Sequence, residues 1–120
     1  MIGYGTALKS REKPYHRMVV LSDPQANGGW VVLVRVTTND GTWSDTACLL
    51  VPADWPELTH ASTVAYSTAK TGQSVAALEQ AIRRGLFTVI ATPSATVLQK
   101  MVSIGKSYAG TPPLAKKWMK

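Results

Sequence analysis

Hydrophobic residues in the first half of the chain gather into two short runs that favour β-strands. The runs cover residues 18–21 and 30–36, and both are rich in β-branched and aromatic side chains, which fit a pleated sheet better than a helix. In the segment between them, Pro24 fixes one backbone angle, and the Asn-Gly-Gly run at 27–29 tolerates positive φ. The pattern predicts an antiparallel β-hairpin.

Two more strands are predicted before residue 70. The Asn-Asp-Gly run at 39–41 is a strong turn signal, and residues 43–51 after it alternate well enough for a third strand. The two prolines within residues 52–56 interrupt the pattern, because proline has no amide hydrogen for a sheet ladder. Residues 62–67 resume it as a short fourth strand. We therefore expect a meander of antiparallel strands.

The pattern changes to helical spacing at Ser74. Residues 74–85 place apolar side chains on one stripe, with Ser74 able to cap the start and Gly85 the end. Residues 86–91 are expected to form a compact strand, and Thr92-Pro93 opens a second helix in the order of cap then proline. The predicted inward residues are Val75, Leu78 and Ile82 in the first helix and Val97, Leu98, Met101, Val102 and Ile104 in the second.

These elements predict a single domain over residues 1–120. Five short strands with tight connections and two short C-terminal helices fit a small, strongly bent antiparallel sheet closed into a barrel, which is a mainly β fold. An open α+β sheet is the alternative. Residues 1–13 are expected to be a flexible arm, and residues 110–120 a tail whose adjacent prolines exclude a helix.

Positive charge is concentrated in the second half of the chain. The formal net charge is +6, yet residues 1–69 carry five Lys or Arg against six Asp or Glu, whereas residues 70–120 carry eight against Glu79 alone. Such a field favours a polyanion such as nucleic acid, or the acidic segment of a partner protein. A surface that merely keeps the protein in solution is the plainer alternative.

The remaining composition narrows the class of protein. Cys48 is the single cysteine, so an intramolecular disulfide and a cysteine-based zinc site are excluded, which is typical of cytosolic proteins. The N-terminus lacks the apolar segment of a signal peptide, and no run of about 18 apolar residues is present to span a bilayer. We expect a cytoplasmic protein without membrane contact, cofactor or metal.

The ends of the predicted hairpin bring together side chains that can act on a phosphodiester. Antiparallel pairing places His16 and Arg17, at the start of one strand, beside Thr37 and Thr38, at the end of the other. An imidazole can take and give a proton at neutral pH, and a guanidinium can neutralise phosphate charge. The threonine hydroxyls can hold phosphate or simply bind the backbone of the following turn.

His60 is the only other histidine, and it precedes the fourth strand, on the rim of the sheet where His16 is expected. Two imidazoles flanking a phosphodiester can run a transesterification, in which one removes the 2′-hydroxyl proton and the other protonates the leaving 5′-oxygen. Arg17 or Arg35 would then neutralise the developing charge. The alternative is that each histidine closes a strand end through a backbone hydrogen bond.

Two further candidates lie on the fourth strand. Ser62 and Tyr66 share one of its faces, where Tyr66 can stack a base or, by default, join the core. The acids Asp45 and Asp54 show no spacing that indicates a metal site.

Residues 16–22, HRMVVLS, and residues 34–38, VRVTT, carry a resemblance to a known family. They resemble two strands of the MazF/PemK toxins, where an Arg-Pro pair begins a strand of the type RPxxVLS and a second strand ends in Thr-Thr. In this resemblance the family's catalytic Arg falls on His16, its Pro on Arg17, and its catalytic Thr on Thr37 or Thr38. The similarity spans residues 13–70, and the C-terminal helix fits loosely.

The resemblance implies an SH3-like barrel of the MazF/PemK/CcdB type and a toxin that acts as a metal-independent endoribonuclease on single-stranded RNA. It also implies a homodimer and an acidic antitoxin protein. Histidine carries less charge than arginine at neutral pH, so the difference at position 16 can alter or remove catalysis. The alternatives are a binding module for nucleic acid or protein, and a gyrase-binding toxin of the CcdB kind. The expected catalytic residues are His16, Thr38 and His60, and the expected substrate-binding residues are Arg17, Arg35, Thr37, Ser62 and Tyr66.

Overall fold

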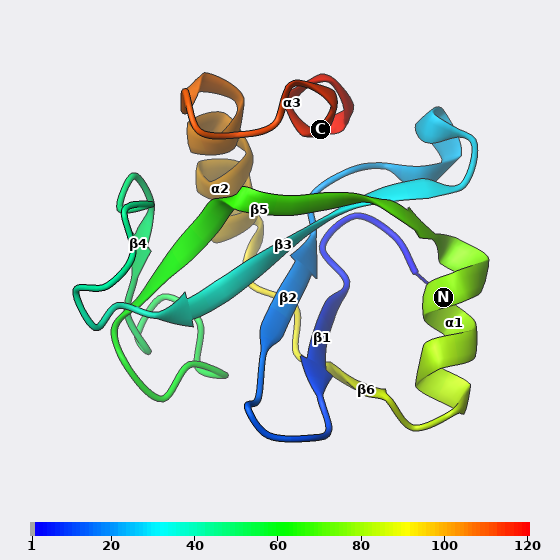
Figure 1. Ribbon diagram of the computed structural model, residues 1–120, viewed down its shortest axis with the longest axis horizontal. Helices are drawn as coiled ribbons and strands as arrows, with labels where there is room; N and C mark the ends of the chain where they lie inside the picture. Colours follow the sequence, from blue (N-terminus) through cyan, green and yellow to red (C-terminus); the bar gives the residue numbers. More distant parts are fainter. Residues whose placement is uncertain (1) are drawn as a thin grey trace.

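A curled, six-stranded sheet forms the centre of the molecule in the computed structural model, which describes residues 2–120 (Figure 1). Every neighbouring pair of strands is antiparallel, in the order β4-β5-β3-β2-β1-β6. The strands are β1 (Ala7–Ser10), β2 (Arg17–Val20), β3 (Trp30–Thr38), β4 (Leu49–Leu50), β5 (Ser62–Ser74) and β6 (Phe87–Ile90). The helices are the 3-10 turn η1 (Pro24–Asn27), α1 (Val75–Arg83), α2 (Ala95–Ser107) and α3 (Pro113–Trp118). The predicted class, a mainly β fold of small-barrel type, is confirmed.

The predicted hairpin is confirmed as β2 and β3. Its register runs from Arg17 opposite Val36 to Val20 opposite Leu33. The connection contains η1 and ends in two glycines with positive φ, 64° at Gly28 and 90° at Gly29. Glycine takes this conformation without the steric cost of a Cβ atom, so the chain can reverse here. The hairpin supplies most of the candidate site.

The predicted meander is wrong, because β5 rather than the next segment pairs with β3. β5 is longer than expected and separates β3 from β4. Of the predicted third strand, residues 43–51, only Leu49–Leu50 is a strand. The segment before it is held by Asp45, whose buried carboxylate accepts hydrogen bonds from the Ser67 amide at 2.9 Å and the Tyr108 hydroxyl at 2.8 Å. Side-chain hydrogen bonds therefore replace the expected strand ladder.

The two terminal segments, which were predicted to lack regular structure, contain a strand and a helix. Within residues 1–13, β1 lies between β2 and β6 and buries Ala7 and Leu8 completely. Within residues 110–120, α3 begins at Pro113. The prolines do not exclude this helix, because amides in the first turn have no acceptor within the helix, so the missing proline amide hydrogen costs no hydrogen bond there. The flexible-arm prediction is wrong for β1, and its first residue lies outside the described residues. The prediction of a tail without a helix is wrong, so the described chain has a third α-helix beyond the two predicted.

The other helix predictions hold with one shift. Ser74 caps α1, and its hydroxyl oxygen accepts from the Ala77 amide at 3.1 Å. α2 is capped by Ser94, whose hydroxyl accepts from the Val97 amide at 3.2 Å, and not by Thr92. The helices differ in the sheet face they cover.

One face of the sheet packs against α2 and α3, and the other packs partly against α1. The larger cluster includes Val19, Val32, Val34 and Val64 from the strands, Leu21 just after β2, and Leu98, Met101, Ala115 and Met119 from the helical region. The smaller cluster consists of Ile2, Leu8, Val20, Val31, Leu33 and Leu78, with Met18 at its margin. The smaller cluster therefore leaves Met18 and part of Leu33 to line a pocket on the α1 side of the sheet.

Candidate functional site

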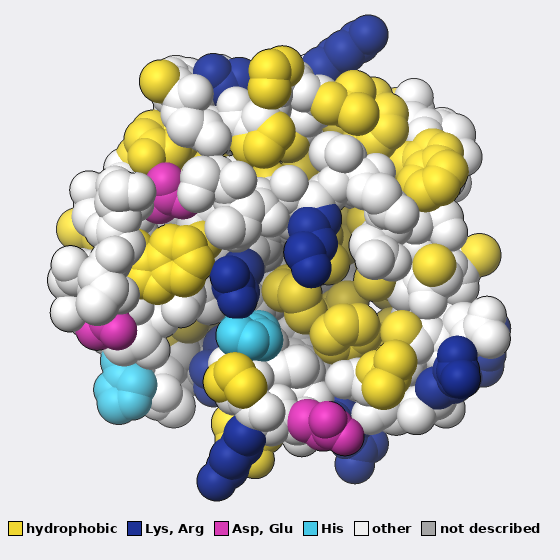
Figure 2. All heavy atoms as spheres, in the orientation of Figure 1, with side chains coloured by type: hydrophobic (Ala, Val, Ile, Leu, Met, Phe, Trp, Pro, Cys, Tyr) yellow, Lys and Arg dark blue, Asp and Glu magenta, His cyan; other side chains and the backbone are white. Residues whose placement is uncertain are grey.

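A small pocket of about 110 Å³ lies on the α1 side of the sheet, where β2, β3 and β5 are neighbours. Figure 2 shows Lys and Arg side chains beside a histidine near the middle of this face, with hydrophobic side chains around them. The lining residues are His16, Met18, Leu33, Arg35, Thr68 and Lys70. The pocket thus joins an imidazole, two cationic side chains and a hydroxyl above an apolar floor.

The register of the hairpin brings His16 and Arg35 together. Met18 pairs with Arg35, and side chains alternate along a strand, so His16, Met18 and Arg35 share one face. The Nη1 atom of Arg35 lies 3.4 Å from the Nδ1 atom of His16. A second contact places the Arg35 guanidinium 5.3 Å from the centre of the Trp43 ring, within the range of a cation–π interaction. Arg35 is therefore oriented from two sides.

An irregularity in β5 supplies the rest of the pocket. Ala65 pairs with Arg35 and Lys70 pairs with Leu33, so four residues of β5 lie opposite Val34 alone. Such a bulge bends its strand and redirects side chains, and here Thr68 and Lys70 line the pocket. Sequence reasoning missed both residues because the fourth strand was expected to end at residue 67. No pattern in the sequence marks the bulge, although its polar run Ser-Thr-Ala-Lys is unusual for a central strand.

The environment of His16 favours its neutral form. Partial burial and the positive charges of Arg35 and Lys70 hold the pKa of the imidazole below its ordinary value of 6.5. The backbone is fixed by two hydrogen bonds to Ser10, from the His16 amide to the Ser10 hydroxyl at 2.8 Å and from the Ser10 amide to the His16 carbonyl at 2.9 Å. A neutral imidazole can accept a proton at pH 7, as a general base must.

The structure separates the two threonines expected beside His16. Side chains alternate along β3, so Thr37 lies on the same face as Arg35. The ladder between β2 and β3 ends with Arg17 opposite Val36, so the next residue, Thr37, lies level with His16. Thr38 lies on the opposite face and pairs with Ser62 on β5. Arg17 also lies on that opposite face, where its Nε atom is buried and lacks a hydrogen-bond partner among the described residues. Of these three candidates, only Thr37 shares the face of the pocket.

His60 is not part of the pocket. It is exposed in the loop before β5, and its carbonyl accepts a hydrogen bond from the Ser62 hydroxyl at 2.9 Å. The histidines of the chain stand apart in Figure 2, and the pocket lining includes His16 alone. Ser62 is 4% exposed and thus has little surface for a ligand. Both histidines precede strands that begin at the same edge of the sheet, as expected, but the pocket does not include His60.

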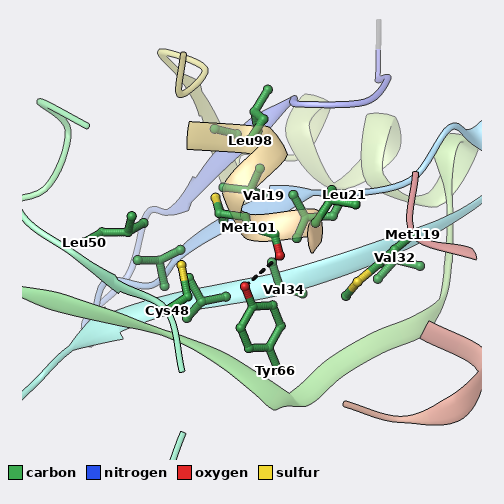
Figure 3. Packing of buried hydrophobic residues seen from close by; sticks show 14 of the residues in the cluster. Val19, Leu21, Val32, Val34, Cys48, Leu50, Tyr66, Leu98, Met101 and Met119 are labelled. Atoms are coloured by element: carbon green, nitrogen blue, oxygen red, sulfur yellow. Dashed lines mark hydrogen bonds between the residues drawn. The ribbon is translucent and has the colours of Figure 1, made fainter. Parts of the chain in front are cut away.

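Tyr66 belongs to the core and not to a base-stacking surface. It is completely buried, and its hydroxyl donates to the Met101 carbonyl at 2.7 Å, as the dashed line in Figure 3 shows. Burial is the main cause that raises the pKa of this phenol far above its usual range. The base-stacking interpretation of Tyr66 is therefore wrong, and its packing against Cys48 and α2 holds the helix on the sheet.

Residues 2–120 contain neither a cluster of metal-ligating side chains nor a helix that could span a membrane. Within residues 2–120, no three His, Cys, Asp or Glu side chains come close enough together to hold a metal ion. None of the described helices is long and apolar enough to cross a bilayer. Comparison with protein-family models and with curated proteins found no match to this chain. The pocket around His16 is thus the strongest basis for a functional proposal.

Proposed function

We propose that the protein is a metal-independent endoribonuclease that cleaves single-stranded RNA at the His16 pocket. The observation that carries the proposal is the contact of His16 with Arg35 in a pocket that Lys70 and Thr68 complete. A base flanked by two cations is suited to a reaction in which a hydroxyl loses a proton and a phosphate gains negative charge. The resemblance of residues 16–22 and 34–38 to the MazF/PemK toxins supports the same chemistry.

The pocket residues divide the reaction among them. Arg35 turns from the Nδ1 atom of His16 to the phosphate, which frees Nδ1 to take the proton of the ribose 2′-hydroxyl. The 2′-oxygen attacks phosphorus, and the bond from phosphorus to the 5′-oxygen breaks. The Lys70 ammonium gives a proton to that oxygen. The Thr37 hydroxyl donates to the phosphate, and the Thr68 hydroxyl does so after it turns away from the Ala65 carbonyl, to which it donates at 2.8 Å. The products are a 2′,3′-cyclic phosphate and a 5′-hydroxyl.

The biological role proposed for this activity is that of the toxin in a cytoplasmic toxin–antitoxin pair. The support is the resemblance to MazF/PemK proteins, together with a basic second half that suits RNA or an acidic antitoxin. A homodimer is proposed on the same resemblance. Expression of the protein should arrest growth with cut RNA and intact DNA, whereas DNA breaks with intact RNA would indicate a gyrase-binding toxin. A neighbouring reading frame for a short acidic protein would support the antitoxin.

RNA digestion tests the enzymatic proposal. The purified protein should cut a single-stranded RNA in the presence of EDTA, leave 2′,3′-cyclic phosphate ends, and fail on a strand with 2′-deoxyribose at the cut position. Residual cleavage of the deoxy strand would contradict the assigned nucleophile. Tight RNA binding without a cut would favour the alternative, a binding module on the same fold. The observation behind this alternative is that Thr38, Arg17 and His60, which were expected to act on the RNA, lie outside the pocket.

A further inference from the structure

The helices α2 and α3 carry lysines and no acidic residue. Glu79 is the last acidic residue of the chain, so residues 80–120 contain none. Figure 2 shows Lys or Arg side chains along the top of the molecule, above α2 and α3. The lysines in and beyond α2 are Lys100, Lys106, Lys116, Lys117 and Lys120. Five of the eight basic residues of the second half thus lie in or beyond α2.

Two of these lysines meet at one groove. The groove has a volume of about 360 Å³, and Lys106 of α2 and Lys120 at the chain end line it together with Tyr4. The Lys120 ammonium lies 4.7 Å from the centre of the Tyr4 ring, and the Lys120 amide donates to the Leu21 carbonyl at 3.0 Å. Lys120 is thereby held beside Leu21, the residue that follows β2. The other lining residues are Ala95, Gln99, Val102 and Ser103, so no Asp or Glu side chain lines the groove.

We propose that this groove binds the phosphate groups of a single-stranded RNA backbone, at a surface separate from the His16 pocket. Two ammonium groups at one groove repel each other, and a bound anion relieves the repulsion. Lys106 and Lys120 can pair with phosphate oxygens, while Gln99 and Ser103 can donate hydrogen bonds to phosphate or ribose. The Tyr4 ring holds the Lys120 ammonium at the groove through their cation–π contact.

The lining of the groove favours RNA over an acidic protein. Protein interfaces depend on large apolar or aromatic anchors. The apolar residues that line this groove, Ala95 and Val102, are small or buried, and the Tyr4 ring is in contact with the Lys120 ammonium. Polar donors and cations are the usual partners of a nucleic-acid backbone. α2 packs on the sheet face opposite the His16 pocket, so RNA binding here does not depend on the cleavage proposed above.

A binding titration on an inactive background tests this proposal. His16→Ala protein should bind a labelled oligouridine of about 20 nucleotides, long enough to span one binding surface. The added double substitution Lys106→Glu with Lys120→Glu should weaken binding about tenfold or more. Loss of two phosphate contacts should also reduce the slope of log affinity against log salt by about 1.4.

The matched control is Arg83→Glu with Arg84→Glu, which makes the same change in net charge at the exposed end of α1. It should weaken binding only a few-fold, and circular dichroism should show that both variants remain folded. Equal losses in the two double variants, or no RNA binding by the His16→Ala protein, would overturn the proposal. A glutamate-rich peptide that displaces the RNA at equal concentration would instead assign the groove to an acidic protein. The binding titration measures RNA binding alone, so a failure of the wild-type protein to cleave RNA would contradict the proposed nuclease activity and not the proposed groove.

Discussion

The Nδ1 atom of His16 lies 3.4 Å from the Nη1 atom of Arg35 across the β2–β3 ladder. Arginine has donors only, so Nδ1 is the acceptor in this contact and the ring proton resides on Nε2. The contact is longer than an ideal hydrogen bond, which makes Arg35 easy to recruit to a phosphate. Arg35 therefore lowers the pKa of His16 in the free pocket and is also the residue proposed to bind the phosphate.

The first prediction concerns the titration of His16. Its pKa should lie below 6.5, because burial and two neighbouring cations disfavour the imidazolium. Arg35→Gln should raise this pKa toward 6.5, since one of those cations is removed. Proton NMR of the His16 ring, followed against pH, measures both values. Lys106→Gln, on the other side of the sheet, is the control and should leave the titration unchanged; a rise there or a fall in Arg35→Gln would refute the assignment.

The second prediction uses the alternation along β3. Thr37→Val should lower the cleavage rate about tenfold, the equivalent of one lost hydrogen bond, because Thr37 lies on the face of the pocket. Thr38→Val, the same change on the opposite face, should leave the rate nearly unchanged. Valine keeps the β-branched shape, so both variants should fold. Rate measurements on one RNA substrate compare them, and a larger loss in Thr38→Val would place the site on the other face.

The third prediction concerns Asp45, which is 2% exposed. Burial alone would raise its pKa, but hydrogen bonds from Ser67 and Tyr108 outweigh this and hold the pKa below the ordinary 3.8. Asp45→Asn should reduce the free energy of unfolding by about 2 kcal/mol at pH 7. Stabilisation by a carboxylate with a lowered pKa is lost as pH falls below about 4, so the difference from wild type should shrink there.

Denaturant unfolding at pH 7 and at low pH measures this difference. Asp40→Asn is the matched control, because Asp40 is exposed and makes only local hydrogen bonds to Thr42. It should have a much smaller effect at pH 7. A destabilisation by Asp45→Asn that grew at low pH would contradict the role given to the carboxylate.

The fourth prediction concerns close packing of α2 on the sheet. A Cβ atom added at Gly105 would lie 2.7 Å from the Met119 sulfur and 2.8 Å from a Tyr66 ring carbon. Gly105→Ala should therefore destabilise the fold by about 1–3 kcal/mol, the usual cost of overpacking a core. Gly72→Ala provides the comparison, since nothing lies within 4 Å of its added Cβ. Thermal unfolding of the two variants should differ clearly, and equal melting temperatures would show that the helix can move away.

The parts of the fold that sequence reasoning predicted are those set by local patterns. β-branched runs and turn residues define the β2–β3 hairpin, and Ser74 followed by helical spacing defines α1. β1 was missed because four residues with two apolar side chains carry almost no periodic signal, although the sheet buries both. Strand order was missed because the pairing of β5 with β3 is set by packing across the sheet and not by the nearest turn.

The candidate site follows the same division. His16 and Arg35 were identified because hairpin register is local. Lys70 and Thr68 depend on a bulge in a strand distant in sequence, and no local pattern places them beside His16. His60 is at the expected edge of the sheet, because β2 and β5 both run antiparallel to β3 and begin beside its end. It lies outside the pocket because its loop carries it beyond the strand, and no local pattern fixes the path of that loop.

The most direct measurement compares RNA cleavage in EDTA by the wild-type protein, His16→Ala and His60→Ala. His16→Ala should be slower by about 100-fold or more, the usual contribution of a general base. His60→Ala should cleave at close to the wild-type rate, because His60 lies outside the pocket. Cleavage that persists in His16→Ala, or that is lost in His60→Ala, would contradict the assignment of the reaction to this pocket.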